Sequence, residues 1–485
     1  MSARELEHVH FIAIGGTGMG SLAGLLKARG IRVTGSDRAL YPPMSTALED
    51  WGIPVVEGFR PENVLADRPD LVVIGNAVRP DNPEARAAID AGLEYRSFSD
   101  ALYELAMAQR HSVVIAGTHG KTTTTSLLAY LLHATGRDPS LLVGGISLDF
   151  GGSFREGEGE HFVVEGDEYD TAFFDKTPKF LHYHPQTLQL TSVEFDHADI
   201  YRDLDHVKSA FRELMRAMPA DGQVVAAGCY ANVVDVLGDA ACEVRRYGVV
   251  DGKSNDGEHS GAAPLDWRAS RLDATPEGTR FAVQGSEGQA ASALLPLYGR
   301  ANVENALGAL AVLDRLDVPL AEAVEALPRY QGVKRRQELR GEVRGVAVID
   351  DFAHHPTAVR ETIAALRSQY RGRRLIAVFE PRTNTSRRAV FQRDYARAFD
   401  EADRTIVKRV PDEPIYSATG EVSELFSADT LADSLRERGL DCRVYDEVDE
   451  IVDALAKDAR EGDVVLTMSN GAFGGIWEKL LAALQ

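Results

Sequence analysis

The sequence predicts an α/β protein of three domains, each built on a mostly parallel sheet. The chain has 485 residues, and at roughly 150 residues per domain this length suits about three domains. Short apolar strands followed by helix-forming stretches recur along the chain, a pattern typical of parallel α/β sheets. Three of these strands lead into loops rich in Gly or Asp. We predict domains at residues 1–108, 109–331 and 332–485.

The first predicted domain begins with a strand, a glycine-rich turn and a helix. The strand runs from His10 to Ile14, the turn reads Gly15-Gly16-Thr17-Gly18-Met19-Gly20, and the next strand leads to Asp37. This βαβ unit, with an acidic residue near the dinucleotide-fingerprint spacing, predicts a Rossmann-like domain. The glycines fit Gly-x-x-Gly-x-Gly better than Gly-x-Gly-x-x-Gly. We favour a diphosphate-binding turn of another kind, with an NAD site and a purely structural turn as alternatives.

The second domain opens on a candidate phosphate-binding loop. The apolar run Val113 to Ala116 enters Gly117-Thr-His-Gly-Lys-Thr-Thr-Thr124, and a helix-forming stretch follows. Loop N–H groups and a helix N-terminus attract anionic oxygen, and Lys121 adds a full positive charge. Thr122 takes the position whose hydroxyl usually ligates Mg²⁺. Ile115 replaces the first glycine of the usual P-loop pattern, and a plain helix cap is the alternative. We favour ATP, and thus a P-loop ATPase-like domain with a mostly parallel sheet.

Acidic residues follow two further strands of this domain. The strand Phe162 to Val164 ends at Glu165-Gly-Asp-Glu168, and the strand Leu188 to Val193 ends at Glu194-Phe-Asp-His197. A carboxylate at the end of a neighbouring parallel strand is where an α/β ATPase holds Mg²⁺. Acidic runs are also common in solvated loops, and this alternative applies to each run alone.

The rest of the central domain offers one further pair of candidates. The stretch 249–291 is rich in Gly, Ser and Asp, which indicates loops and short antiparallel strands. A helix over 299–310 places Asn302 and Asn305 one turn apart on one face. The pair would either cap local backbone or recognise the edge of a base through its amides.

The third region follows a linker at 330–332 and the cluster Lys334-Arg335-Arg336. The strand 346–349 ends in Asp350-Asp-Phe-Ala-His-His-Pro356, and Pro356 suits the first turn of the helix that follows. Strands at 375–379 and 464–468 end in Glu380-Pro-Arg382 and Ser469-Asn-Gly471. These features predict a second Rossmann-like domain. His354 and His355 could be ordinary loop histidines, but two neighbouring aspartates favour a ligand contact.

Charge and composition limit the partners. The formal net charge is −21, which argues against nucleic acid as a partner. Nucleotide sites would then need locally positive side chains. No window of 18 apolar residues indicates a transmembrane helix, and the N-terminus does not resemble a signal peptide. Three scattered cysteines suit a reducing cytoplasm. We therefore expect a cytoplasmic protein without a membrane partner.

These motifs, in this order, resemble the Mur ligase family of peptidoglycan synthesis. The resemblance covers essentially the whole chain, with one departure at Ala301, where relatives usually carry His. The motifs that carry it are the glycine-rich turn with Gly35-Ser36-Asp37, Gly117 to Thr124, Glu165 to Glu168, Asp196-His197, Gly299 to Asn302 with Asn305, Arg335-Arg336, and Asp350 to Pro356.

The resemblance implies an ATP-dependent ligase of peptidoglycan recycling. Its expected reaction joins the tripeptide L-alanyl-γ-D-glutamyl-meso-diaminopimelate to UDP-N-acetylmuramate through an acyl phosphate. The closest alternative adds free L-alanine instead. A nicotinamide dehydrogenase and a catalytically silent UDP-sugar-binding regulator are alternatives of other classes. The expected assembly is a monomer or a weak homodimer.

The resemblance also implies site residues. Lys121, His197, Arg336 and His355 are the expected catalytic residues. Thr122 and Glu165 are expected to bind one Mg²⁺, and His197 is expected to bind a second metal. Mn²⁺ is an alternative ion. The UDP-sugar is expected to bind at Gly15, Gly18 and Asp37. The peptide is expected to bind at His355 and Arg382. The expected ATP-binding residues are Gly117, Thr118, His119, Gly120, Lys121, Thr122, Thr123, Asn302, Asn305, Arg336 and Asp351.

Overall fold

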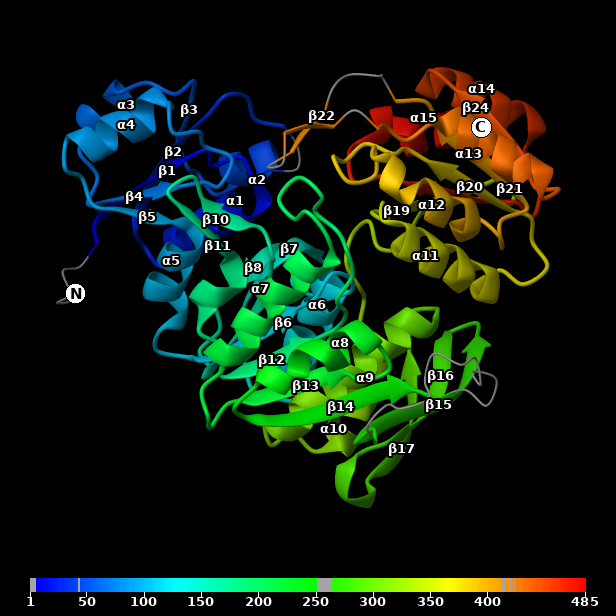
Figure 1. Cartoon of the computed structure of the whole chain (residues 1–485), viewed down its shortest axis with the longest axis horizontal. Helices are drawn as coiled ribbons and strands as arrows, with labels where there is room; N and C mark the ends of the chain where they lie inside the picture. The colour runs from blue at the N-terminus through cyan, green and yellow to red at the C-terminus, as the bar shows by residue number, and fades with distance from the viewer. Residues whose placement is uncertain (1–5, 42–43, 251–263, 411–414, 418–419, 423) are drawn as a thin grey trace.

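The chain forms three α/β domains in sequence order. The computed structural model describes residues 6–41, 44–250, 264–410, 415–417, 420–422 and 424–485. Three main sheets, mostly parallel, follow one another along the chain, as Figure 1 shows. The predicted fold class is therefore confirmed. Within the described ranges, no helix is long and apolar enough to cross a membrane.

The N-terminal sheet has five parallel strands in the order β3-β2-β1-β4-β5. Alternate residues of its central strands face two apolar clusters, one on each side, as expected for a parallel sheet covered on both faces. Its elements are β1 (His8–Ile12), α1 (Thr17–Ala28), β2 (Arg32–Asp37), α2 (Met44–Asp50), β3 (Val55–Glu57), α3 (Glu62–Leu65), β4 (Leu71–Ile74), α4 (Pro83–Asp90), β5 (Tyr95–Ser97) and α5 (Phe98–Leu102).

The first strand differs from its prediction. It begins two residues earlier than expected, because His8 already pairs with Arg32. It also ends two residues earlier, because Ala13 takes a left-handed conformation with φ 67°. The N–H groups of Ala13 and Ile14 both donate to the carbonyl of Ser36. The chain therefore leaves the sheet before the glycine-rich turn, which brings Gly15 towards the end of β2.

A buried polar network ties this sheet to α4. Glu84 is fully buried. One of its oxygens accepts from His10 Nε2 at 2.7 Å and from the Ser36 hydroxyl at 2.8 Å. The other accepts from Asn63 Nδ2 at 2.7 Å and from the Arg60 N–H at 3.2 Å. One carboxylate thus accepts from four donors, and those of His10 and Ser36 are buried.

The central sheet has ten strands in the order β17-β16-β15-β14-β13-β12-β6-β9-β7-β8. Strand β6 lies between β9 and β12, parallel to both. The elements are β6 (His111–Ala116), α6 (Lys121–Ala134), β7 (Ser140–Ser147), β8 (Gly152–Arg155), β9 (His161–Gly166), β10 (Asp170–Ala172), β11 (Asp175–Pro178), β12 (Thr187–Leu190), α7 (Leu204–Ala217), β13 (Gln223–Ala227), α8 (Ala231–Val236), β14 (Glu243–Val249), β15 (Trp267–Thr275), β16 (Gly278–Gln284), β17 (Ala290–Leu295), α9 (Arg300–Arg315) and α10 (Leu320–Ala326).

Two expectations for this sheet need correction. Strand β12 ends at Leu190 rather than at Val193. Thr191 still donates its N–H to Ala116, the last residue of β6, but Ser192 accepts from the N–H groups of Thr118 and His119 in the loop after β6. Helix α9 continues five residues beyond the predicted Leu310. The predicted antiparallel strands within 249–291 are present as β15 and β16, with the start of β17; residues 251–263 of that stretch lie outside the described ranges.

The C-terminal sheet has the order β18-β19-β25-β20-β21-β24, and only β18 at its edge is antiparallel. Strands β20 and β25 have the predicted bounds. The elements are β18 (Glu338–Val343), β19 (Val346–Asp351), α11 (Pro356–Gln369), β20 (Leu375–Phe379), α12 (Gln392–Ala398), β21 (Arg404–Lys408), β22 (Ile415–Ser417), β23 (Gly420–Val422), α13 (Ala428–Glu437), β24 (Asp441–Tyr445), α14 (Val448–Asp458), β25 (Val464–Met468) and α15 (Ile476–Ala483).

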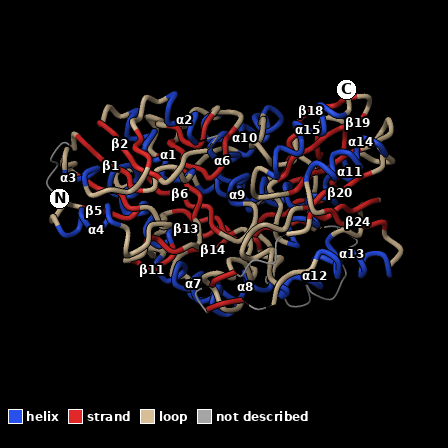
Figure 2. The backbone as a smooth tube through the Cα atoms, turned by 90° about the horizontal axis from the view of Figure 1, so that it is seen from above, coloured by secondary structure: helices blue, strands red, loops and turns tan. Residues whose placement is uncertain are grey.

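The central domain lies between the other two, which occupy opposite ends of the molecule (Figure 2). At the N-terminal side, Ser21 and Ser153 share a hydrogen bond of 2.6 Å across the interface. At the C-terminal side, the Thr385 hydroxyl accepts from the Ala198 N–H at 3.2 Å. The ring of Phe195 stacks on that of Phe391 with centroids 5.8 Å apart. The C-terminal domain is therefore docked on the central domain.

The Glu84 network yields a stability prediction. Glu84→Ala removes the only acceptor shown for His10 Nε2, and each buried donor left unpaired costs about 1–3 kcal/mol. We expect a loss of about 3 kcal/mol or more in the free energy of unfolding, measured by denaturant titration with circular dichroism. Asp90→Ala, at an exposed position of the same helix, is the control and should change little. Equal stability of both variants would contradict a structural role for the network.

Candidate functional site

The loop between β6 and α6 has the backbone of an anion-binding loop. Gly120 caps α6 in a left-handed conformation with φ 79°. A side chain at Gly120 would collide with Asn305 Oδ1, and one at Gly117 would collide with Thr191 Oγ1. The first four N–H groups of a helix lack partners within it, and they attract anions. Glycine at both positions lets the loop pack closely against α9 and the residue that follows β12. The free N–H groups at the N-terminus of α6 stay in place.

Lys121 is buried against its own loop and an acidic strand end. Its Nζ donates to the carbonyl of Gly117 at 2.7 Å and to Glu168 Oε2 at 2.7 Å. Burial disfavours the charged amine, but the carboxylates of Glu168, Asp167 and Glu165 outweigh burial and raise the pKa of Lys121. Lys121 therefore stays protonated, and Glu168 is the anion that holds its charge in this structure.

Thr122 and Glu165 form the pair expected to hold Mg²⁺. The register places Glu165 on β9 directly opposite Ile115 of β6. The Thr122 hydroxyl lies 3.0 Å from Glu165 Oε1, and Glu165 Oε2 also accepts from the Gly144 N–H at 2.9 Å. Two adjacent oxygens of an octahedral Mg²⁺ site lie at about this separation, given bonds of about 2.1 Å. These residues fit the ion.

His197 belongs to a second group. Its Nε2 lies 3.2 Å from Glu168 Oε1, and Asp167, Glu168 and His197 place ligand-type atoms within 4.8 Å of one another. Burial acts to lower the pKa of His197, but Asp196 and Glu168 raise it to about 9. In this state the ring is an imidazolium, so a metal at His197 must displace its proton.

A cavity of about 380 Å³ opens beside the loop, between the central and C-terminal domains. Its volume falls within the range of small-molecule sites. Seven of the predicted ATP-binding residues line it: His119, Gly120, Thr123, Asn302, Asn305, Arg336 and Asp351. Gly117 and Thr118 lie in the adjoining loop, and Lys121 and Thr122 in the first turn of α6; none of the four is in the lining.

The predicted residues from the C-terminal side are held firmly. Arg336 lies over the Phe352 ring at 5.0 Å, and its Nη2 lies 3.4 Å from the Thr122 hydroxyl. Asp351 accepts from the N–H groups of Gln337 and Ala353 at 2.8 and 2.7 Å. Burial raises the pKa of Asp351. The guanidinium of Arg336 therefore reaches the predicted Mg²⁺ pair from the interdomain linker.

Sequence reasoning missed the far end of this cavity. Tyr230 and Glu304 line it, and the Tyr230 hydroxyl donates to Glu304 Oε2. Glu304 is buried on α9, and burial raises its pKa. On a predicted helix a single Glu between two Asn residues looks like an exposed side chain. No sequence pattern indicates that Glu304 contacts Tyr230 in the folded chain.

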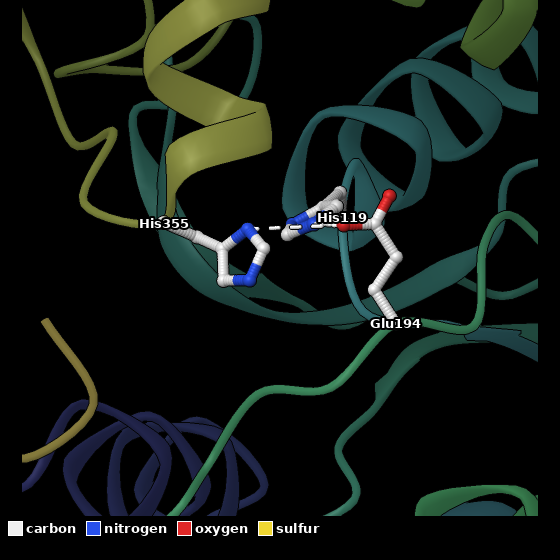
Figure 3. A group of neighbouring side chains, drawn as sticks. All are labelled: His119, Glu194 and His355. Atoms are coloured by element: carbon white, nitrogen blue, oxygen red, sulfur yellow. Dashed lines mark hydrogen bonds and ion pairs between the residues drawn. The ribbon is translucent and has the colours of Figure 1, made fainter. Parts of the chain in front are cut away.

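Sequence reasoning also missed the position of Glu194. Glu194 Oε2 lies 3.2 Å from His119 Nε2 and 3.8 Å from His355 Nδ1, and it accepts from the Thr357 hydroxyl at 2.7 Å. Figure 3 shows the three side chains converging from the loop before α6, the segment after β12 and the start of α11. Burial acts to raise the pKa of Glu194, but His119 lowers it to about 2.

Both ring nitrogens of His355 have partners within the protein. Nε2 lies 3.1 Å from the carbonyl of Phe195, and Nδ1 accepts from the Thr357 N–H at 3.3 Å as the cap of α11. Burial, helped by His119, lowers the pKa of His355 to about 4. The ring is therefore neutral, and it joins the C-terminal domain to the central domain.

The remaining predicted residues lie at the two ends of the molecule. Gly15 donates its N–H to Asp37 Oδ2 at 2.7 Å, and Gly18 packs against the ring of Phe98. The structure thus brings Gly15 and Asp37 together at the carboxyl end of the N-terminal sheet. Arg382 follows β20, is exposed, and lies against the backbone of Gly471.

The packing of Gly120 yields a prediction on nucleotide binding. Gly120→Ala should weaken ATP binding by at least about tenfold, because the strain and the collision with Asn305 must reshape the loop. Gly136→Ala is a matched control: it has φ 80°, lies beyond the other end of α6, and has open space around it. Isothermal titration with ATP compares the two. Equal affinities would show that the contact with Asn305 does not shape the site.

Sequence models of the Mur ligase family match three stretches of the chain. These are the family's catalytic domain at residues 8–110, its middle domain at 115–313, and its glutamate ligase domain at 335–471. Together they span most of the sequence.

Similar proteins match over nearly the whole chain. Relatives from Haemophilus influenzae and Escherichia coli are both named UDP-N-acetylmuramate–L-alanyl-γ-D-glutamyl-meso-2,6-diaminoheptandioate ligase. The first is 36% identical over 99% of this chain and 100% of its own, and the second 37% identical over 98% of each. A solved murein peptide ligase from Psychrobacter arcticus has a TM-score of 0.72 at 34% identity, and the match covers 99% of this chain and 98% of that one. The chain belongs to the Mur ligase family.

Proposed function

We propose that this ligase joins the tripeptide L-alanyl-γ-D-glutamyl-meso-diaminopimelate to UDP-N-acetylmuramate, with hydrolysis of ATP to ADP and phosphate. The observation that carries the proposal is the cavity of about 380 Å³, where the phosphate-binding loop, the Asn pair of α9 and Asp351 of the C-terminal domain meet. The two relatives named above support the choice of substrates. Their names describe the same acid and the same peptide.

The chemistry requires the acid to be activated. An amine cannot expel oxide from a carboxylate, so the lactyl carboxylate of UDP-N-acetylmuramate first attacks the γ-phosphorus of ATP and releases ADP. The α-amine of the tripeptide's alanine then attacks the acyl phosphate, and phosphate leaves with the C–O bond electrons. Both steps depend on position and on the neutralisation of developing charge. Alignment of the three substrates could contribute roughly 7–11 kcal/mol.

The proposed roles of the central residues follow from their contacts. Lys121 exchanges Glu168 for the β- and γ-phosphates, and Gly117 to Thr123 wrap the phosphates with backbone N–H groups. Thr122 and Glu165 would hold one Mg²⁺, which would offset phosphate charge, and His197 would hold a second metal near the acceptor carboxylate. Arg336, already beside Thr122, stabilises the transferring phosphoryl group. Asn302 and Asn305 contact adenine, and Asp351 contacts ribose.

The outer domains carry the other substrates in this proposal. Residues 1–108 bind the UDP end at Gly15, Gly18 and Asp37, residues 109–331 bind ATP, and residues 332–485 present the peptide. Exposed Arg382 contacts the peptide. His355 caps α11 and thereby fixes the start of that helix for peptide binding. A cytoplasmic location fits the ATP requirement and the three free cysteines.

A substrate comparison tests the proposal. Phosphate release from ATP and UDP-N-acetylmuramate is measured with either the tripeptide or free L-alanine as the amine. We expect the tripeptide to give the faster reaction, with kcat/KM at least about a hundredfold higher, or about 2.7 kcal/mol. Preference for L-alanine would favour the alternative ligase. Absence of turnover with both would favour a silent UDP-sugar-binding protein.

Arg336 yields a second prediction. Arg336→Ala should lower kcat by about a hundredfold or more, because a guanidinium aimed at developing charge acts mainly in the transition state. Lys334→Ala removes the same charge from an exposed position of the same linker and should leave kcat within about twofold. Steady-state kinetics with all three substrates compare the variants. Equal losses of kcat in both variants would mean that the positive charge of the segment, and not the position of Arg336, determines the rate.

A further inference from the structure

The cluster of His119, Glu194 and His355 has the composition of a transition-metal site. Two imidazole nitrogens and one carboxylate oxygen lie within 4.8 Å of one another. The distances to Glu194 Oε2 are 3.2 Å from His119 Nε2 and 3.8 Å from His355 Nδ1. Ligand atoms of a tetrahedral Zn²⁺ with bonds of about 2.0–2.1 Å are about 3.3 Å apart. The two distances to Glu194 are therefore close to those of a tetrahedral site, and Figure 3 shows the three side chains converging.

The surrounding contacts orient the ligands. A carbonyl only accepts hydrogen bonds, so the contact of 3.1 Å with Phe195 places a proton on His355 Nε2 and a lone pair on Nδ1. That lone pair faces Glu194, and the Thr357 N–H that shares it is distant at 3.3 Å. The Thr357 hydroxyl holds the carboxylate of Glu194 at 2.7 Å. Metal-binding His residues typically donate their other N–H to a carbonyl or carboxylate in this way.

The ligand types separate this cluster from the Mg²⁺ residues. Thr122 and Glu165 offer oxygen only, which suits Mg²⁺. Two imidazoles with one carboxylate suit Zn²⁺, Co²⁺ and similar ions, and three protein ligands leave a fourth position open. The group around His197 contains one imidazole and two carboxylates. It could bind the same ion, so a test must distinguish the two groups.

We propose that His119, Glu194 and His355 form a second, interdomain metal site that binds Zn²⁺ or a chemically similar divalent cation. The ligands come from the loop before α6, the segment after β12 and the cap of α11. A bound ion therefore links the C-terminal domain to the phosphate-binding loop and holds the docked arrangement. His119 and Glu194 also line the nucleotide cavity, so the ion occupies its wall. Binding of the ion does not depend on the proposed reaction.

Cobalt spectroscopy on the full chain tests this site. Co²⁺ in a four-coordinate site absorbs visible light far more strongly than aqueous Co²⁺, and Zn²⁺ that competes for the site removes the band. We expect such a band for the wild-type chain and for His197→Ala. We expect its loss in His355→Ala and in Glu194→Gln, with affinity reduced by at least about a hundredfold, since even partners outside the coordination shell contribute 10–100-fold.

Each result of that experiment decides the question. Absence of the band in the wild-type chain overturns the proposal. So does a band that disappears in His197→Ala and persists in His355→Ala, since the ion then sits at the other group. Circular dichroism checks the fold of each variant. Should His355→Ala unfold because α11 loses its cap, Glu194→Gln keeps that cap and decides alone.

Discussion

The buried ion pair between Lys121 and Glu168 is the interaction on which the site depends. A buried charge without a partner is costly, and removal of one partner typically costs 3–5 kcal/mol. The 2.7 Å contact holds the loop lysine against the end of β9, and the other oxygen of Glu168 lies beside His197. This chain of charges joins the ends of β6, β9 and the segment after β12. A nucleotide phosphate that approached Lys121 would compete with a carboxylate that is already in place.

Several contacts that dock the C-terminal domain lie next to this charge chain. Phe195 stacks on Phe391, and the Thr357 hydroxyl and the His355 ring bond to Glu194 and to the Phe195 carbonyl. All of these contacts use the segment after β12, which leaves the sheet at Leu190 to bond with the phosphate-binding loop. The same backbone segment thus positions both the loop and the incoming domain. Movement of the C-terminal domain would change the surroundings of His119, because the ring of His119 lies 4.6 Å from that of His355.

The fold was largely predictable because apolar runs mark buried parallel strands. Strands β20 and β25 have the predicted bounds, and the adjacency of β9, β6 and β12 could be anticipated from the residues that follow them. The end of β12 was not predictable, because Ser192 bonds to a loop that only the folded chain supplies. Glu194 and His355 are 161 positions apart, and Glu304 meets Tyr230 only through tertiary packing. Periodicity and local motifs carry no information on such contacts.

The charge around the loop decides how a triphosphate can bind. The charges of Lys121, Lys179 and His197 hold the pKa values of Asp167 and Glu168 below their ordinary values despite burial, and His197 does the same for Asp196. These three carboxylates are therefore ionised at neutral pH. They face a place proposed for a polyanion, in a chain whose net charge is already −21. Each carboxylate has a cationic partner, but a nucleotide at Lys121 would bring its phosphates close to these carboxylates, and buried like charges repel. Under the proposed function, a divalent cation held by Thr122 and Glu165 would offset this repulsion, so the metal-bound nucleotide would bind better than the free one.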